Sequence, residues 1–158
     1  MQDIIELVFI TLLPFLELRA SIPYGILVKQ MSVATVFLVC VVTNILLAPV
    51  LYIFLDKFVN FFFYFKWFEK SYQRYVKKSQ KKIKKYVDKY GTLGVAIFIG
   101  IPLPGSGVYT GAIGSYVLGL KFKKFIVAAV LGVLIAAVAV TIITLIGVNG
   151  LGIFIKTI

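Results

Sequence analysis

Histidine is absent from the 158 residues, and the only cysteine is Cys40. A single cysteine cannot form an internal disulfide, and without a Cys/His cluster a zinc-type metal site is excluded. Only six residues are acidic, and the sequence contains no nucleophile–base pair, P-loop or GxGxxG motif. We therefore expect no enzyme, no metal centre and no cofactor.

Apolar residues are abundant instead. They make up 61% of the chain, and the mean hydropathy is +1.02. A soluble domain of this length could not bury that much apolar surface, so part of the surrounding solvent must be lipid. Cys40 lies inside one apolar run and is most simply explained as apolar filler. The N-terminal MQDIIE is acidic where a signal peptide would be basic, so we expect the first segment to be retained.

The net charge of +11 is unevenly distributed. Ten of the 17 basic residues lie between Lys66 and Lys89, and three more form KFKK at 121–124. In a nucleic-acid-binding protein such a run would contact phosphates. Here apolar, lipid-compatible segments flank the run, and the positive-inside rule favours cytoplasmic loops of a protein in the cytoplasmic membrane. We expect no nucleic-acid partner.

Two uninterrupted apolar runs, 31–55 and 125–148, are long enough to cross a hydrocarbon core of about 30 Å. Segment 91–120 is also apolar, but its centre reads IPLPGSG, which cannot continue a helix. If this segment crossed the bilayer, the basic loops on its two sides would lie on opposite faces. A re-entrant helical hairpin keeps both loops cytoplasmic, so we favour the hairpin.

Segment 4–28 is broken at its centre by Pro14, Glu17, Arg19 and Pro23. It is either a kinked span or a second re-entrant hairpin that opens outward, and its short flanks favour the hairpin. Each hairpin then precedes a spanning helix. The predicted fold is an all-α polytopic membrane protein of two inverted repeats, an arrangement typical of secondary transporters.

A weak internal match supports the repeat. At an offset of 88 residues, Pro14 aligns with Pro102, and ILLA at 45–48 aligns with VLIA at 133–136.

Glu17 and Arg19 are the first candidate site, because a charge at mid-membrane is costly and is usually paired and functional. We expect the two side chains to lie on one side of an extended hairpin tip. In a functional interpretation Arg19 holds an anionic group while Glu17 binds a proton. In the structural alternative the two charges neutralise each other and pin the hairpin.

The second tip offers hydroxyl groups and backbone amides instead of charge. Ser106, Tyr109 and Thr110 lie near a predicted helix start and could cradle an anion. Alternatively, the tip is a turn whose glycines allow close helix approach. Asn44, beside Thr43 in the first span, is either a partner for a tip or an ordinary interhelical contact.

The segment 57–90, between the repeats, is predicted to be a basic amphipathic helix on the cytoplasmic surface. Tyr72, Val76, Ile83 and Tyr90 recur at helical spacing, and the aromatic cluster FFFYFKWF comes just before them. Its run at 66–90 would attract anionic lipid head groups. A solvated loop is the alternative.

Two motifs, ELRASIPYG and PLPGSGVYTGAIGSYVLGL, resemble the signature stretches of the small multidrug export proteins, which are related to the DedA/VTT membrane proteins. The likeness extends over nearly the whole chain, including Asn44 and Pro49. It implies two re-entrant hairpins and a transporter role, and in DedA relatives the flipping of polyprenyl-phosphate or other lipids. DedA proteins carry charges in both hairpins, whereas this chain has none in the second.

By position, the resemblance assigns two sets of motif residues. The first set is Glu17, Arg19 and Pro23, and the second is Pro102, Pro104, Gly105, Gly107, Thr110 and Gly111.

The sequence as a whole predicts a transporter. The leading hypothesis for its cargo is an anionic amphiphile such as a lipid-linked phosphate, moved in a flippase-like and proton-coupled way. A small multidrug exporter and a structural or scramblase-like membrane protein are the alternatives. A homodimer is plausible, because four helical segments would cover the hairpin tips poorly. The predicted substrate- or proton-binding residues are Glu17, Arg19, Pro23, Asn44, Pro102, Pro104, Gly105, Ser106, Gly107, Tyr109 and Thr110.

Overall fold

The computed structural model describes residues 1–62, 90–103 and 105–155, with only the backbone described at 59–62 and 148–155. Every regular element in these ranges is helical. The elements are α1 (Gln2–Leu12), α2 (Glu17–Pro23), the π-helical turn η1 (Tyr24–Val28), α3 (Val33–Phe62), the Tyr90–Gly100 helix, α5 (Val108–Val117) and α6 (Phe122–Ile155). The basic amphipathic helix predicted at 57–90 lies largely outside the described residues.

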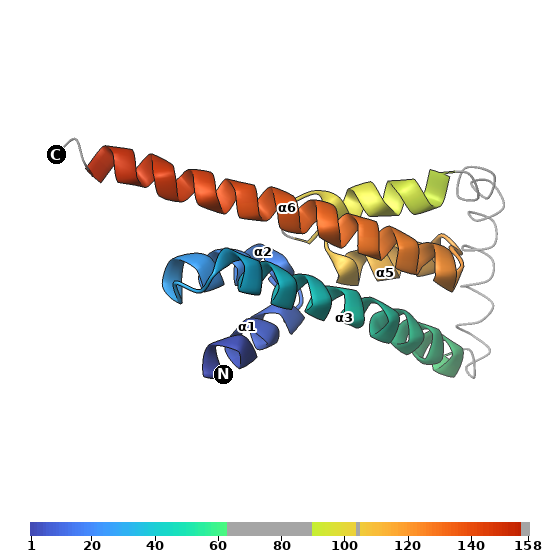
Figure 1. The fold of residues 1–158 in the computed structure, drawn as a ribbon. Helices are drawn as coiled ribbons and strands as arrows, with labels where there is room; N and C mark the ends of the chain where they lie inside the picture. Colours follow the sequence, from blue (N-terminus) through green and yellow to red (C-terminus); the bar gives the residue numbers. More distant parts are fainter. Residues whose placement is uncertain (63–89, 104, 156–158) are drawn as a thin grey trace.

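Helices α3 and α6 are the two long elements and contact each other, and the C-terminal part of α6 extends beyond α3 (Figure 1). Val33–Phe58 and Phe122–Gly147 are long and apolar enough to cross a membrane. One side of α3 exposes an apolar residue every fourth position, at Leu38, Val42, Leu46, Val50 and Phe54. Contact of such an apolar stripe with lipid has no free-energy cost, whereas its exposure to water is unfavourable.

The buried face of α6 includes a row of small residues. Ala128, Gly132 and Ala136 follow one another at intervals of four and are all buried. A Cβ atom on Gly132 would lie 2.6 Å from Ile99 Cβ and 2.7 Å from the Ala96 carbonyl oxygen. The Tyr90–Gly100 helix therefore packs directly on the α6 backbone, as helices in membranes commonly do.

Residues 2–28 form a helical hairpin, called hairpin 1 here. The chain runs inward along α1, turns at 13–16, and returns through α2 and η1 (Figure 1). Lys29 Nζ joins the two ends of the hairpin, at 3.0 Å from Asp3 Oδ1 and 2.7 Å from Glu6 Oε2. The Tyr24 hydroxyl also donates to Glu6 Oε2 at 3.0 Å.

Residues 90–117 form a second helical hairpin, called hairpin 2. The Tyr90–Gly100 helix ends before Pro102, and α5 starts after Gly105 has turned the chain with a φ of 83°. The break lies where the sequence predicts it. The returning arm ends beside the far part of α3, where the rings of Tyr52 and Tyr116 lie 5.8 Å apart and Tyr52 donates to the Leu120 carbonyl at 2.7 Å.

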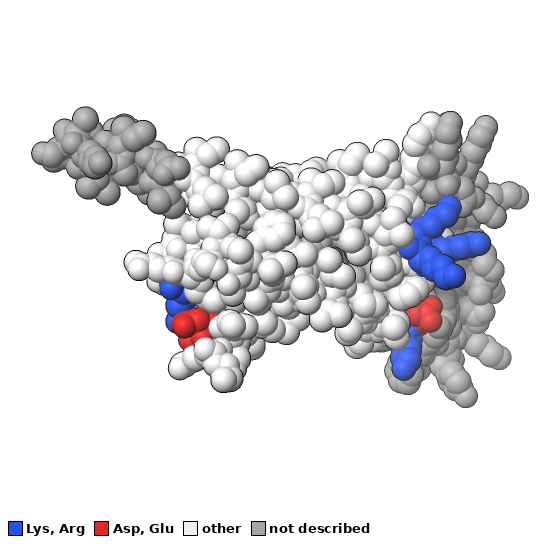
Figure 2. Space-filling view, in the orientation of Figure 1, with Lys and Arg blue, Asp and Glu red and all other residues white. Residues whose placement is uncertain are grey.

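The two hairpins thus start from opposite ends of an elongated molecule and meet near its middle (Figure 1). Figure 2 shows that charged side chains gather at the two ends of the visible face, with an uncharged band between them. The sequence and the packing place KFKK (121–124) at the end where hairpin 2 opens, and the Lys29 cluster at the end where hairpin 1 opens.

Candidate functional site

The carboxylate of Glu17, from hairpin 1, binds the start of α5 in hairpin 2. The backbone N–H of Val108 donates to Oε2 at 3.1 Å, and that of Tyr109 donates to Oε1 at 3.3 Å. The first N–H groups of a helix have no partner inside the helix, and the helix dipole makes this end positive. Glu17 therefore caps α5 from a distant part of the chain.

Gly107, the N-cap residue of α5, provides the room for this contact. A Cβ atom at this position would overlap the carboxylate of Glu17. The φ of Gly107 is −89°, which any residue can adopt, so the requirement for glycine is one of space.

The guanidinium of Arg19 binds the other side of the same break. Its Nη2 donates to the carbonyls of Ile99 at 2.8 Å and Ile101 at 2.9 Å, and it lies 3.2 Å from the Ser106 carbonyl and from Ser106 Oγ. The carbonyl of Ile99 lies at the C-terminal end of the Tyr90–Gly100 helix, which is the negative end of the helix dipole. Arg19 thus donates hydrogen bonds to backbone carbonyls that have no partner within the helix because the helix is broken there.

Glu17 and Arg19 also bind each other, with 2.9 Å between Oε2 and Nη1. Their side chains are only 3% and 9% exposed. The pair is therefore a buried ion pair whose two members each bind one broken end of hairpin 2. Burial of such a pair is tolerated when further hydrogen bonds satisfy the charges. Here backbone groups of hairpin 2 bind the carboxylate of Glu17 and Nη2 of Arg19, while Nε of Arg19 is buried without a partner in the described part of the chain.

Hydroxyl groups complete the junction between the tips. Ser106 Oγ lies 2.7 Å from the Ile101 carbonyl and 2.8 Å from the Leu103 carbonyl, so its single hydroxyl hydrogen is shared between two oxygens of the turn. Thr110 Oγ1 donates to the Gly105 carbonyl at 2.6 Å. The Tyr109 hydroxyl donates across the junction to the carbonyl of Leu12, at the end of α1, at 2.5 Å.

The backbone of hairpin 1 at the junction differs from the prediction. Glu17 and Arg19 belong to a helix, α2, and the extended tip expected from the sequence is wrong. Phe15 and Glu17 have φ values of 72° and 46°, in the left-handed region that costs a residue with a side chain about 1–2 kcal/mol. The contacts of Glu17 with Arg19 and α5 offset this strain.

A buried polar cluster fixes hairpin 1 to α3. Thr11 Oγ1 lies 2.7 Å from Ser21 Oγ, and Ser21 Oγ lies 3.1 Å from Cys40 Sγ. Ser21 Oγ also donates to the carbonyl of Glu17 at 3.1 Å. Sequence reasoning missed Thr11 and Ser21, although two hydroxyl residues inside apolar segments are a recognisable signal.

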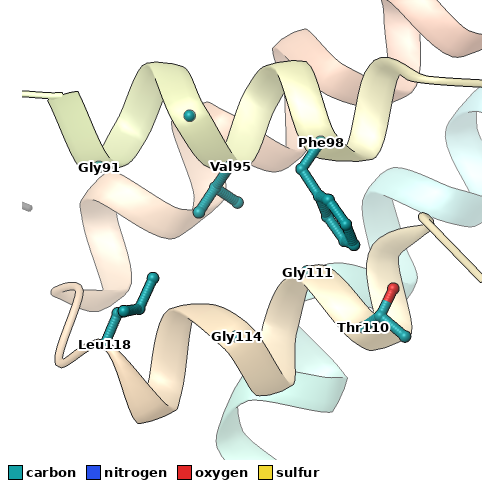
Figure 3. A pocket seen from close by; sticks show the side chains of 8 residues that line it. Gly91, Val95, Phe98, Thr110, Gly111, Gly114 and Leu118 are labelled. Atoms are coloured by element: carbon teal, nitrogen blue, oxygen red, sulfur yellow. The ribbon is translucent and has the colours of Figure 1, made fainter.

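A cavity of about 340 Å³, open on one side, lies beside the junction, between the two arms of hairpin 2, and its lining residues Gly94 and Phe98 are exposed. Figure 3 shows Val95 and Phe98 pointing from the Tyr90–Gly100 helix toward α5, where Gly114 leaves the space open. Thr110 forms its polar corner, and no lining residue carries a charge.

Comparison with known families gives one match. Residues 17–139 match the family described as "Putative small multi-drug export protein", so the match covers the junction, the cavity and most of both long helices. The chain belongs to this family. No curated protein and no solved structure matches it. The relationship to DedA/VTT proteins stays a prediction.

In this member of the family, the structure brings together most of the predicted site residues. Those at the junction are Glu17, Arg19, Gly105, Ser106, Gly107, Tyr109 and Thr110. Pro23 lies at the end of α2, Pro102 is exposed in the turn, and neither has a described hydrogen bond to the ion pair. Pro104 lies outside the described residues.

Of the two roles predicted for Asn44, the structure does not support that of a partner for a hairpin tip. Asn44 is fully buried in α3, and within the described residues neither its amide nitrogen nor its amide oxygen has a hydrogen-bond partner. It therefore binds neither tip in this arrangement. A buried amide without a partner is unfavourable.

Proposed function

We propose that this protein exports small, largely apolar molecules across the cytoplasmic membrane, through a path formed by two hairpins that enter from opposite faces. The family to which the chain belongs supports the export role. The observation that carries the proposal is the junction of the hairpin tips, where Glu17 and Arg19 form the only contact between charged side chains that is buried in the described part of the chain.

The positions of the hairpin ends support the proposed membrane arrangement. Hairpin 1 opens beside the Lys29 cluster, and hairpin 2 opens beside the basic residues of KFKK. The positive-inside rule then favours hairpin 2 as the cytoplasmic one. Irregular backbone at mid-membrane must be covered by protein, and each tip would cover the other. Each hairpin precedes a spanning helix, which supports an inverted repeat.

Protonation of Glu17 is the proposed trigger. The charged carboxylate attracts both Arg19 and the positive end of α5. A neutral carboxyl group loses most of this attraction, so the junction weakens and the hairpins can separate. An exporter that exchanges protons for substrate needs such a link between one titrating group and one moving contact.

The role of Arg19 in this proposal differs from that of a substrate receptor. Both terminal nitrogens of the guanidinium already bind protein oxygens. The arginine therefore has a task at the junction that requires no anionic cargo, and an apolar or weakly polar substrate becomes compatible with the site.

One observation favours a second candidate, the anionic amphiphile. The carboxylate of Glu17 occupies a position next to both an arginine and the first N–H groups of α5, which is a favourable environment for any anion. If protonated Glu17 left this position, a phosphate or carboxylate group of a lipid could enter.

Proton flux in proteoliposomes tests the proposal. Vesicles with an acidic lumen and an enclosed pH-sensitive dye receive 4-aminobenzophenone, an uncharged aromatic compound, from outside. We expect the compound to accelerate proton efflux through the parent protein and not through Glu17→Gln. Equal efflux with and without the compound would contradict export. Acceleration by an alkyl phosphate alone would favour the second candidate, and lipid redistribution without any proton flux would favour a scramblase-like protein.

A further inference from the structure

We infer that the cavity between the arms of hairpin 2 is the binding site for the apolar body of the substrate, and that it selects uncharged molecules with one hydrogen-bond donor. That the ligand is a transported substrate rests on the proposed function, whereas its binding to the cavity can be tested independently of transport. Its volume of about 340 Å³ lies in the range of small-molecule sites.

The size of the cavity results from glycine. At both Gly94 and Gly114, an added Cβ atom would meet no other atom within 4 Å. Gly111 differs, because a Cβ atom there would lie 2.6 Å from the side chain of Ile99. Gly111 thus permits the two arms to approach, while Gly94 and Gly114 leave the space between them open. Larger side chains at these two positions would fill the cavity without disturbing the helix packing.

The polarity of the lining defines the chemical class of the ligand. The lining carries no charge to pair with an ionic ligand, so a charged molecule would lose its hydration without compensation. Thr110 is the one lining residue with a polar side chain. Its hydroxyl hydrogen is directed to the carbonyl of Gly105, so its oxygen retains lone pairs that accept a hydrogen bond. A hydroxyl, amide or aromatic amine donor on the ligand would satisfy it.

The ion pair connects this cavity to the junction. One wall is α5, whose first N–H groups bind Glu17. The other wall is the Tyr90–Gly100 helix, whose terminal carbonyl at Ile99 binds Arg19. Each member of the pair therefore holds one wall of the cavity. Loss of the pair would release both walls, which couples ligand binding to the charge of Glu17.

Photocrosslinking tests the site in the full chain in nanodiscs of zwitterionic lipid. The probe is 4-aminobenzophenone, which is uncharged and carries an aromatic amine. We expect the crosslinked peptides to map to the cavity, near Val95, Phe98 and Leu118. Gly94→Leu and Gly114→Leu should each reduce the yield at least about fivefold. Gly147→Leu is the matched control, because this exposed α6 glycine also has open space around it and lies away from the cavity.

Thr110 variants provide a second test that does not depend on filling the space. Thr110→Val should reduce crosslinking of 4-aminobenzophenone but not of benzophenone, which lacks the donor, and Thr110→Ser should restore it. Crosslinks spread over the lipid-facing sides of α3 and α6, unchanged by Gly94→Leu and Gly114→Leu, would overturn the inference, because the cavity would then hold only lipid chains. Crosslinks in the cavity without compound-driven proton flux would support the binding site and contradict the export function.

Discussion

At the scale of single residues, Gly107 has the least freedom to change. The carboxylate of Glu17 occupies the space in which any side chain at this position would begin. The cap that Glu17 forms on α5 therefore requires glycine at position 107.

Gly107→Ala tests this requirement. The Cβ atom should displace the carboxylate and leave the N–H groups of Val108 and Tyr109 without an acceptor. We expect the free energy of unfolding to fall by about 1–3 kcal/mol, the usual cost of unpaired buried polar groups. Denaturant unfolding in detergent micelles measures it. Gly147→Ala, at an exposed position inside α6, should raise it by up to about 1 kcal/mol, because alanine favours the helix more than glycine does. Equal stability of the two variants would contradict the contact.

Neutralising both charges separates a structural pair from a functional one. In Glu17→Gln/Arg19→Gln, the amide oxygen at 17 still accepts from Val108, and neither position keeps an unpaired buried charge, so folding should survive. Transport should not, because no titrating group remains. Arg19→Lys should retain part of the activity, since lysine lacks the planar fork that joins Glu17 to the turn. If the double variant has the parent rate of proton flux, then the ion pair has only a structural role.

Single residues also show how far the sequence could predict the site. Glu17 and Arg19 stand out because charges are rare in apolar segments. Their partners cannot be read in the same way, because a carbonyl such as that of Ile99 and an N–H such as that of Val108 occur in almost every residue. Only the fold determines which backbone carbonyl and N–H groups lack a partner within a helix. The capping of hairpin 2 by hairpin 1 could therefore not be predicted from the sequence.

At the scale of elements, the sequence predicted the breaks better than the local conformations. The prolines and glycines at 102–107 end one helix and precede another, as expected. Near Pro14 and Pro23 the same reasoning predicted an extended tip, but residues 17–23 are helical. Pro14 lies in the turn at 13–16, which is enough to reverse the chain, and Pro23 lies where α2 passes into the π-helical turn η1. The long helices extend beyond the predicted spans, to Phe62 and Ile155, because hydropathy defines the lipid-covered part and not the end of the helix.

The open end of hairpin 1 should respond to acid. The hydrogen bond and charge of Lys29 lower the pKa values of Asp3 and Glu6 below 3.8 and 4.5, their ordinary values. Because the folded pKa values are depressed, the stabilisation is present above the unfolded values and is lost as the pH falls through the lower folded values. The groups are exposed, so the effect is small.

Lys29→Gln tests this contribution. The thermal midpoint of the parent protein should fall more than that of the variant when the pH is lowered from about 7 to about 3. The comparison between the two proteins removes the effect of Glu17, which both contain. The same decrease in both would show that Lys29 does not hold the two ends of hairpin 1 together.

At the scale of the whole molecule, the arrangement predicts which positions share a face of the membrane. In a Cys40→Ala background, cysteines replacing Lys57 and Lys121 should react only with reagents that reach the cytoplasmic side. A cysteine replacing Gln30 should react from the other side. Labelling of positions 57 and 121 from opposite sides would mean that residues 90–120 cross the membrane, and the inverted repeat would fail. A homodimer and the binding of anionic lipid at 66–90 stay predictions.

The central claim is that the charge of Glu17 determines whether the hairpins stay together. Electron paramagnetic resonance in nanodiscs tests this claim through the distance between two spin labels. One label replaces Phe15, in the tip of hairpin 1, and the other replaces Lys123, at the start of α6. As the pH is lowered, the distances in the parent protein should shift toward those of Glu17→Gln, while the distances in the variant stay constant. If the parent gives one distribution at every pH, or if both proteins shift alike, then Glu17 does not control the junction.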